Sequence, residues 1–329
     1  MNNRAAMALA LALVIGVGVV IGIALCYGNA TTTNSGDNSG YAVPHGPIYI
    51  VGDNSFTPAN GVNGGGSGTA DDPYIIESWV IDASGGYGIR IRSTTKYFVI
   101  RNCLVENSWG NYSGIYLENV VNGKIENNTC SNNGGCGIRL DNSSYNNLTN
   151  NNCSNNDFGI YLIHSSNNTL SNDICSSNST GISLHSSPHN NLTNNTCENN
   201  GAYGTYLYSS NYNNLTNNTC SYNAECGISL WASSSYNNLT NNTCENNYYG
   251  IWLESSYSNS ITLNYLLNNT ENDACQWYGV NSWDRNGHGN YWGDWQPPTY
   301  PDSNGDGIVD TPRPIAGGSN KDNYPLVLP

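Results

Sequence analysis

Short apolar pairs recur along the chain at an interval of about 22–23 residues. Each pair reads Ile-x-Leu or a close variant and follows a glycine; these glycines are Gly88, Gly114, Gly137, Gly159, Gly181, Gly204, Gly227 and Gly250. An apolar residue at every second position is what a β-strand requires, because side chains along a strand alternate between its two faces. Helical repeats need roughly 33 residues or more, so the interval favours several very short strands per repeat.

A second pattern, typified by NNLTNNTC, follows later in each repeat and ends on a cysteine. Cysteines hold this slot at Cys103, Cys130, Cys153, Cys175, Cys197, Cys220 and Cys244. One repeat cannot bury its own apolar side, so its neighbours must supply the contact. The pattern therefore predicts an all-β, right-handed parallel β-helix (solenoid) of about eight coils, with inward columns such as Ile138, Leu140, Leu148 and Cys153.

Each repeat also supplies residues for its corners and its interior stack. We expect glycine to permit a tight corner before each strand. Asparagine tolerates unusual backbone angles and hydrogen-bonds to nearby peptide groups, so we expect it at the corners. Stacking places the asparagines of successive coils above one another, where amide ladders can form.

The repeat pattern divides the chain into segments. Residues 88–270 form the predicted solenoid, while residues 47–87 and 271–329 break the pattern and are predicted to be the N-terminal and C-terminal caps. Caps are needed because the exposed edges of the first and last coils would invite aggregation.

The N-terminal residues predict export. An unbroken run of apolar residues and glycine extends from Ala5 to Cys26 and follows a single cation, Arg4. The run is near the ~20 residues that span a bilayer, so residues 1–28 are interpreted as a signal-anchor, with a cleaved signal peptide as the alternative. Residues 29–46 are rich in Thr, Ser and Gly and are predicted to be a flexible linker. We therefore expect an extracellular or cell-surface location.

Composition limits the partners. The net charge is −14 and only 10% of residues are charged. Such a chain cannot neutralise a row of phosphates, so nucleic acid is not expected as a partner, and neither is an anionic membrane surface. Sequons are dense and suggest a glycoprotein, although several are expected to face inward; examples are Asn111, Asn127, Asn142, Asn147, Asn152, Asn167, Asn178 and Asn191.

The cysteines of the ladder are predicted to be buried thiols rather than disulfides. Parallel Cβ vectors one coil apart leave the Cβ atoms farther apart than the ~3.5–4.5 Å that a disulfide needs. Cys136 and Cys226 fall outside the ladder, so local bridges from Cys130 to Cys136 or from Cys220 to Cys226 remain possible. Thiolates could also bind Cu(I), but copper is not the expected cofactor.

Residues at the outward positions of the Ile-x-Leu strands supply the candidate chemistry. Tyr206, Tyr208, Trp231 and Trp252 are predicted to form an exposed aromatic strip that stacks on sugars. The alternative is that these residues simply favour strands and pack on neighbouring coils. Glu118 and Asp141 are predicted neighbours that could serve glycoside hydrolysis, or could pair with nearby arginines.

The segment DSNGDGIVD near the C-terminus resembles the first part of a calcium loop. Oxygen ligands would come from Asp302, Asn304, Asp306, the Ile308 carbonyl and Asp310. Arg313 occupies the place of the bidentate glutamate of the full loop. Calcium is therefore the expected metal.

The GIxL and NxLxxNxC coils, together with the flanks SGTADDPYIIESWVID and NYWGDW…DSNGDGIVDTPRPI, resemble the NosD-like right-handed parallel β-helix family, in its archaeal-type surface form. This family also bears the name of carbohydrate-binding and sugar-hydrolysis repeats. The resemblance implies the fold over residues 47–329. It also implies either copper handling or action on polysaccharides, and the chain's only methionines, Met1 and Met7, lie outside the repeats.

The leading hypothesis for function is a non-catalytic cell-surface glycoprotein that binds polysaccharide or cell-envelope proteins and is attached to the membrane by its N-terminal segment. A polysaccharide lyase or hydrolase is the first alternative, and a NosD-like copper-handling protein is the second.

Overall fold

The computed structural model describes residues 43–329, which include every repeat. The predicted signal-anchor (1–28) and most of the linker (29–46) lie outside the described residues. Within residues 43–329, no helix is both long and apolar enough to cross a bilayer.

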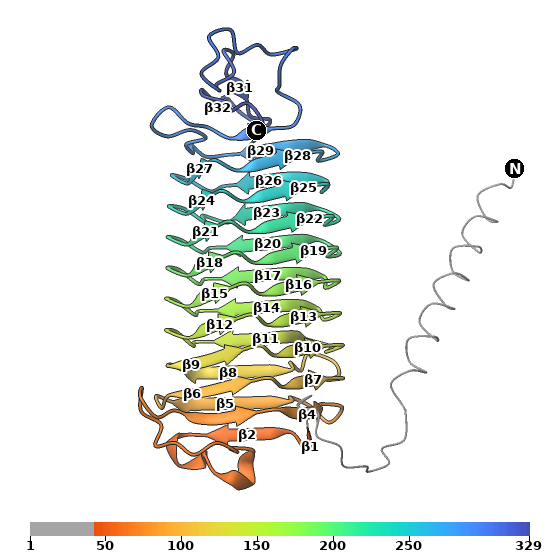
Figure 1. Ribbon diagram of the computed structural model, residues 1–329, viewed down its shortest axis with the longest axis vertical. Helices are drawn as coiled ribbons and strands as arrows, with labels where there is room; N and C mark the ends of the chain where they lie inside the picture. Colours follow the sequence, from red (N-terminus) through yellow and green to blue (C-terminus); the bar gives the residue numbers. More distant parts are fainter. Residues whose placement is uncertain (1–42) are drawn as a thin grey trace, which may run out of the picture. The chain divides into compact units, whose positions relative to one another are not determined.

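Three parallel sheets run the length of the described unit, and each coil contributes one short strand to each sheet (Figure 1). The ten-stranded sheet contains β2 (Ile48–Val51), β5 (Ile89–Thr94), β8 (Ile115–Val120), β11 (Cys136–Asp141), β14 (Phe158–Ile163), β17 (Thr180–His185), β20 (Tyr203–Tyr208), β23 (Cys226–Trp231), β26 (Tyr249–Glu254) and β29 (Asn272–Trp277).

The nine-stranded sheet contains β3 (Tyr74–Glu77), β6 (Phe98–Arg101), β9 (Gly123–Glu126), β12 (Asn147–Thr149), β15 (Thr169–Ser171), β18 (Asn191–Thr193), β21 (Asn214–Thr216), β24 (Asn238–Thr240) and β27 (Ser260–Thr262). The eleven-stranded sheet contains β1 (Val43–His45), β4 (Trp79–Asp82), β7 (Leu104–Glu106), β10 (Thr129–Ser131), β13 (Asn152–Ser154), β16 (Ile174–Ser176), β19 (Thr196–Glu198), β22 (Thr219–Ser221), β25 (Thr243–Glu245), β28 (Tyr265–Leu267) and β30 (Tyr291–Trp292).

The parallel solenoid is confirmed, but the expected number of coils is too small. The ten-stranded sheet shows about ten coils rather than eight. The additional strands come from residues outside the predicted repeat segment: β2 pairs with β5 at the beginning, and β29 pairs with β26 at the end. Parallel strands pair through backbone hydrogen bonds, so the pairing continues where the spacing of the glycines is lost.

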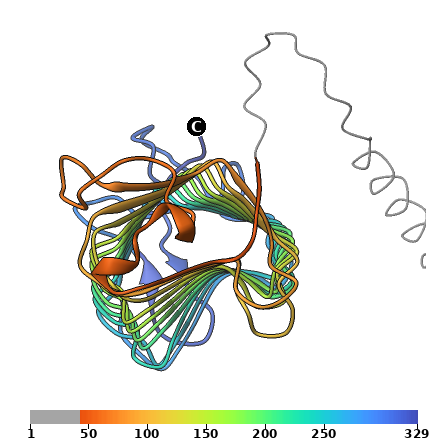
Figure 2. The ribbon, with the colours of Figure 1, turned by 90° about the horizontal axis from the view of Figure 1, so that it is seen from below.

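The interior is built from columns of identical or similar side chains. Viewed along the solenoid axis, successive coils superimpose closely (Figure 2). Cys130, Cys153 and Cys175 pair in register on adjacent strands, and each is fully buried. The predicted file of cysteines is therefore confirmed, and all ten cysteines in the described part of the chain are free thiols.

The glycines before the Ile-x-Leu residues were expected to permit tight corners, but the structure gives them a packing role instead. A Cβ atom on Gly159 would lie 2.6 Å from the carbonyl oxygen of Gly181 and 2.9 Å from the Cβ of Cys175. Gly159 lies within β14 and does not have a positive φ. Glycine is therefore needed because adjacent coils and the cysteine column leave no room for a side chain, rather than because the chain turns sharply there.

Asparagine has two roles in the coils, and both were expected: some asparagines form the corners and others form ladders in the interior. Asn127, Asn132 and Asn150 adopt positive φ angles of 55°, 56° and 57°, a region that asparagine tolerates better than most residues. Other asparagines point inward and form ladders along the axis. Asn195, for example, donates from Nδ2 to the Leu170 carbonyl at 3.1 Å and to the Oδ1 of Asn218 at 3.0 Å.

Asp173 replaces asparagine in the middle of one ladder. Its Oδ1 accepts hydrogen bonds from the backbone N–H and side-chain amide of Asn151, at 2.8 and 2.9 Å, as an asparagine oxygen would. Its Oδ2 occupies the place of the amide nitrogen and has no hydrogen-bond partner, although the residue is fully buried. Burial raises the pKa of the Asp173 carboxyl to about 8. A protonated carboxyl would donate where the asparagines of the ladder donate.

Both ends of the solenoid are covered. At the N-terminal end (Figure 2), the chain forms two 3₁₀ turns, η1 (Asp53–Ser55) and η2 (Pro58–Asn60). They flank the buried Phe56, which stacks on Tyr74. At the C-terminal end, the buried Trp292 donates to Asp322 at 2.9 Å. The hairpin of β31 (Arg313–Pro314) and β32 (Lys321–Asp322) lies in this segment.

Candidate functional site

The outer face of the ten-stranded sheet changes its chemistry along the axis. Its strands are paired in register, so outward residues form columns one strand spacing (about 4.8 Å) apart. Arginines and carboxylates lie on β5, β8 and β11, whereas tyrosines and tryptophans lie on β20, β23 and β26. We call these regions the charged zone and the aromatic zone.

In the charged zone, each carboxylate has an arginine partner. Glu118 contacts Arg90 at 2.7 Å, and Asp141 contacts Arg139 at 3.1 Å. The Tyr116 ring lies between the two guanidinium groups, with its centroid 5.3 Å from each. This arrangement suits mutual neutralisation and cation–π packing. Glu118 and Asp141 are thus on adjacent strands as predicted, and each is ion-paired.

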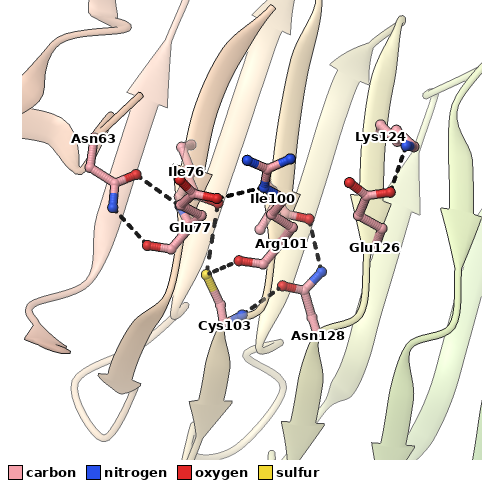
Figure 3. Close-up of polar contacts among 9 residues, drawn as sticks. All are labelled: Asn63, Ile76, Glu77, Ile100, Arg101, Cys103, Lys124, Glu126 and Asn128. Atoms are coloured by element: carbon pink, nitrogen blue, oxygen red, sulfur yellow. Dashed lines mark hydrogen bonds and ion pairs between the residues drawn. The ribbon is translucent and has the colours of Figure 1, made fainter. Parts of the chain in front are cut away.

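The same concentration of charge occurs on the neighbouring nine-stranded sheet. Figure 3 shows Glu77 paired with Arg101, and Lys124 paired with Glu126 at 2.6 Å, all on β3, β6 and β9. It also shows the first cysteine and asparagine of the inner columns, where the Cys103 backbone N–H donates to Asn128 at 3.1 Å. Beyond Arg139, the sequence has no lysine or arginine until Arg285. The basic residues of the coils therefore all lie near the N-terminal end.

The aromatic zone contains a groove of about 310 Å³. Five of the seven lining residues are aromatic, and the full lining consists of Tyr203, Glu225, Cys226, Trp231, Tyr248, Tyr249 and Trp252. The indole nitrogens of Trp231 and Trp252 are buried and have no hydrogen-bond partner. Buried indole N–H groups usually find an acceptor, and within the described residues these two have none.

The groove arises from an alternation of large and small residues. Tyr203, Cys226 and Tyr249 are paired in register on successive strands, so a small thiol lies between two large rings. Burial raises the pKa of the Cys226 thiol to about 12, which keeps it an inert, uncharged surface. Burial, and after it a hydrogen bond with Glu225, raises the pKa of the Tyr203 hydroxyl well above its usual range.

The predicted aromatic strip is brought together only in part. Trp231 and Trp252 both line the groove, while Tyr206 packs edge-to-face on Trp231 with ring centroids 6.4 Å apart. Tyr208 stacks on His185 at 4.7 Å and does not line the groove.

Sequence reasoning missed Tyr203, Glu225, Tyr248 and Tyr249. From β11 onward, the residue before the glycine already belongs to the strand, and at Tyr203 and Tyr249 this residue lines the groove. The tyrosine–glycine pairs at Tyr203 and Tyr249 could have revealed these positions.

The loop predicted to bind calcium is exposed and uses its oxygens locally. Asp302 accepts from the backbone N–H groups of Gly305 at 2.8 Å and Gly307 at 2.9 Å, and Asp306 accepts from that of Ile308 at 2.9 Å. Asp310 accepts from the Ser303 backbone N–H at 3.0 Å, and hydrogen bonding with the Ser303 side chain, followed by this backbone bond, lowers the pKa of its carboxyl. Calcium binding by Asp302, Asn304, Asp306, Ile308 and Asp310 stays a prediction.

Few of the described side chains are placed where they could bind a metal ion. Within 43–329, no group of three or more His, Cys, Asp or Glu side chains is placed to hold a metal ion. The Cys244 thiol is fully buried, and burial raises its pKa far above the usual range, so a thiolate is disfavoured there. His164 and His185 lie with ring centroids 6.4 Å apart and belong to no such group. These residues do not fit a copper site, and we derive no step through copper.

The stacked coils and parallel sheets define an all-β parallel solenoid of about ten coils. Residues 37–196 match the family described as right handed beta helix region. Residues 147–297 match the family described as periplasmic copper-binding protein (NosD). The predicted resemblance to NosD-like β-helix repeats is thereby confirmed.

Solved structures that are similar to this chain include polysaccharide-acting enzymes. The A-module of mannuronan C-5 epimerase AlgE6 from Azotobacter vinelandii is 18% identical with a TM-score of 0.57, over 63% of this chain and 62% of that chain. The AlgE4 A-module from the same organism is 16% identical with a TM-score of 0.48, over 67% and 68% of the two chains. Pectate lyase Pel9A is 12% identical with a TM-score of 0.43, over 74% and 78%.

At these identities the likeness concerns the fold alone. The chain spans 62% of the length of the AlgE6 module. The search of the curated proteins found no match to this sequence.

Proposed function

We propose that the protein is a non-catalytic, cell-surface β-helix that binds a polysaccharide at the aromatic zone of its ten-stranded sheet. The observation that carries the proposal is the aromatic groove, beside which the indole N–H groups of Trp231 and Trp252 have no acceptor. Sugar rings present apolar C–H faces that pack on aromatic rings, and their hydroxyl oxygens can accept from indole N–H groups.

The scaffold suits a polymeric ligand. Because the strands repeat every ~4.8 Å, the aromatic zone extends along the axis instead of ending in a single closed pocket. Tyr206 and Tyr208 lie on β20, next to the strand that carries Trp231. A polysaccharide could contact this strip beyond the groove, while a cell-envelope protein is the alternative partner for the same surface.

Binding of the full chain to a panel of immobilised polysaccharides tests the proposal. Trp231→Ala and Trp252→Ala should each weaken binding about tenfold or more, because central aromatic residues dominate such contacts. Trp109→Ala is the matched control, since Trp109 is 62% exposed and lies outside the groove. The proposal fails if no polysaccharide binds, or if all three variants bind as the wild type does.

Export and glycosylation belong to the same proposal. They are supported by the apolar run from Ala5 to Cys26 and by the density of sequons. Asn178 is buried and so cannot accept a glycan in the folded protein, whereas Asn142 and Asn147 are exposed. Protease treatment of intact cells should cleave the protein, and resistance before lysis would contradict a surface location.

A polysaccharide lyase or hydrolase is the second candidate, and the charged zone would be its site. Glu118 is paired with Arg90 and Asp141 with Arg139, so each carboxylate would have to leave an ion pair before it could act on a substrate. Release of reducing ends or unsaturated products by the wild type, abolished in Glu118→Gln, would favour the enzyme.

A further inference from the structure

The aromatic groove lies in a part of the coils that contains acids without bases. Glu225 lines the groove and is exposed, and Glu254 ends β26, the strand that carries Trp252. The sequence has no lysine or arginine between Arg139 and Arg285, so no cation of the central coils offsets these carboxylates. The charged zone, by contrast, pairs its carboxylates with arginines.

The size and polar atoms of the groove restrict what can enter. A volume of about 310 Å³ lies at the small end of ligand clefts, so the groove accommodates a sugar unit or two of a longer chain. The indole N–H groups of Trp231 and Trp252 are donors only and need oxygen acceptors. The Glu225 carboxylate is an acceptor only, and besides its hydrogen bond with Tyr203 it can accept from a further donor. A sugar hydroxyl meets both requirements because it donates and accepts.

We propose that the groove selects uncharged pyranose units and rejects uronic acids and other acidic sugars. The inference rests on the proposed function and deepens it by naming the class of polysaccharide. A neutral sugar can accept from an indole N–H, donate to Glu225 and cover the rings of Tyr203, Tyr249 and Trp252 with its apolar face. A sugar carboxylate would instead approach Glu225 with no cation to compensate the repulsion.

Titration calorimetry of the full chain tests the selectivity with defined probes. The neutral probes are oligosaccharides of glucose, mannose and galactose, and the acidic probes are oligogalacturonate and oligomannuronate of the same length. In low salt, at least one neutral series should bind about tenfold tighter than either acidic series. Raising the salt to about 0.5 M should narrow the gap, because salt screens the repulsion.

Two substitutions locate the selectivity. Glu225→Lys should raise the affinity for the acidic probes about tenfold by replacing repulsion with attraction, and should leave stability unchanged because the side chain is exposed. Glu245→Lys is the matched control: Glu245 lies on β25 of the eleven-stranded sheet, away from the groove, and should leave the selectivity as in the wild type.

The outcomes separate this inference from the proposed function. Tight binding of acidic probes that Trp252→Ala abolishes would overturn the neutral selectivity but keep a polysaccharide-binding groove. Selectivity that is the same in Glu225→Lys as in the wild type would overturn the role of the carboxylate. Absence of binding by every probe would overturn the inference together with the proposed function.

Discussion

The inner and outer columns of the ten-stranded sheet follow different rules, although the same strands carry both. The inner positions repeat with little change, as at Ile160 and Ile182, which are fully buried and paired in register. The outer positions vary from coil to coil, from Arg139 through Tyr161 to Ser183. Stacking thus constrains the interior tightly, while the exterior is free to carry the groove and its chemistry.

Among the interior columns, the asparagine ladder is interrupted by one different residue, Asp173. An acid in a ladder of asparagines is compatible with the stack only when it can donate as an amide does. The outer face tolerates a change of residue type without needing a replacement hydrogen bond. Cys226, which lies between two tyrosines, creates a groove there rather than a packing defect. Substitutions on the inner face should therefore change the stability of the protein much more than substitutions on the outer face.

The largest effect is expected from the charge state of Asp173. Its pKa is raised by burial to about 8 in the folded protein, from an ordinary value of 3.8. A raised pKa means that the stabilising contribution is complete below the ordinary pKa and is lost as the pH rises through about 8. Asp173→Asn restores the amide ladder and should make the protein roughly 4–6 kcal/mol more stable than the wild type above that pH.

Denaturant unfolding between pH 4 and 9.5 measures this difference. Asp71→Asn, at an exposed position, is the control and should follow the wild type. Parallel stability curves for the wild type and Asp173→Asn would show that the buried carboxyl does not hold its proton.

The second prediction concerns the close packing of adjacent coils at Gly159. Gly159→Ala would place a Cβ 2.6 Å from the Gly181 carbonyl oxygen, so neighbouring coils would have to move apart. Overpacking of this kind costs about 1–3 kcal/mol. Gly201→Ala is a matched control, because its new Cβ would come no closer than 3.7 Å to a neighbour. Equal melting temperatures for the two variants would refute the packing role of Gly159.

A third prediction concerns Cys226, the small residue that leaves the groove open. Cys226→Phe should occupy the space between Tyr203 and Tyr249 and weaken polysaccharide binding about tenfold, while the coil interior stays intact. Cys226→Ser keeps the space open and should bind like the wild type. Undiminished binding by a folded Cys226→Phe would show that the ligand lies elsewhere.

The smallest effect is expected in the charged zone. Glu118→Gln removes the partner of Arg90, but both side chains are partly exposed, so the free energy of unfolding should change by less than about 1 kcal/mol. Polysaccharide affinity should not change. An appreciable loss of affinity would extend the binding surface from the aromatic zone into the charged zone.

The solenoid could be predicted from sequence because its repeat records the stacking directly. The file of cysteines at Cys153 and Cys175 and the corner asparagines followed from spacing and side-chain chemistry alone. The additional coils could not be predicted, because β2 and β29 lack the glycine-led pattern and pair through backbone hydrogen bonds that any sequence can make.

The candidate site was predicted less completely than the fold. Trp231 and Trp252 lie at outward positions that the strand period identifies. Tyr203 and Tyr249 escaped because the strand begins before the glycine at which the pattern was aligned. Whether neighbouring outward side chains leave a hollow depends on their relative sizes and rotamers, which spacing does not specify.

The most direct test of polysaccharide binding at the aromatic zone is to observe the two unpaired indole N–H groups during a titration. In a ¹⁵N-labelled protein, with signals assigned through Trp231→Phe and Trp252→Phe, a neutral oligosaccharide should shift the indole signals of these two tryptophans. The signal of Trp109, which lies outside the groove, should stay in place. Saturable binding that leaves the Trp231 and Trp252 signals unmoved would contradict the account.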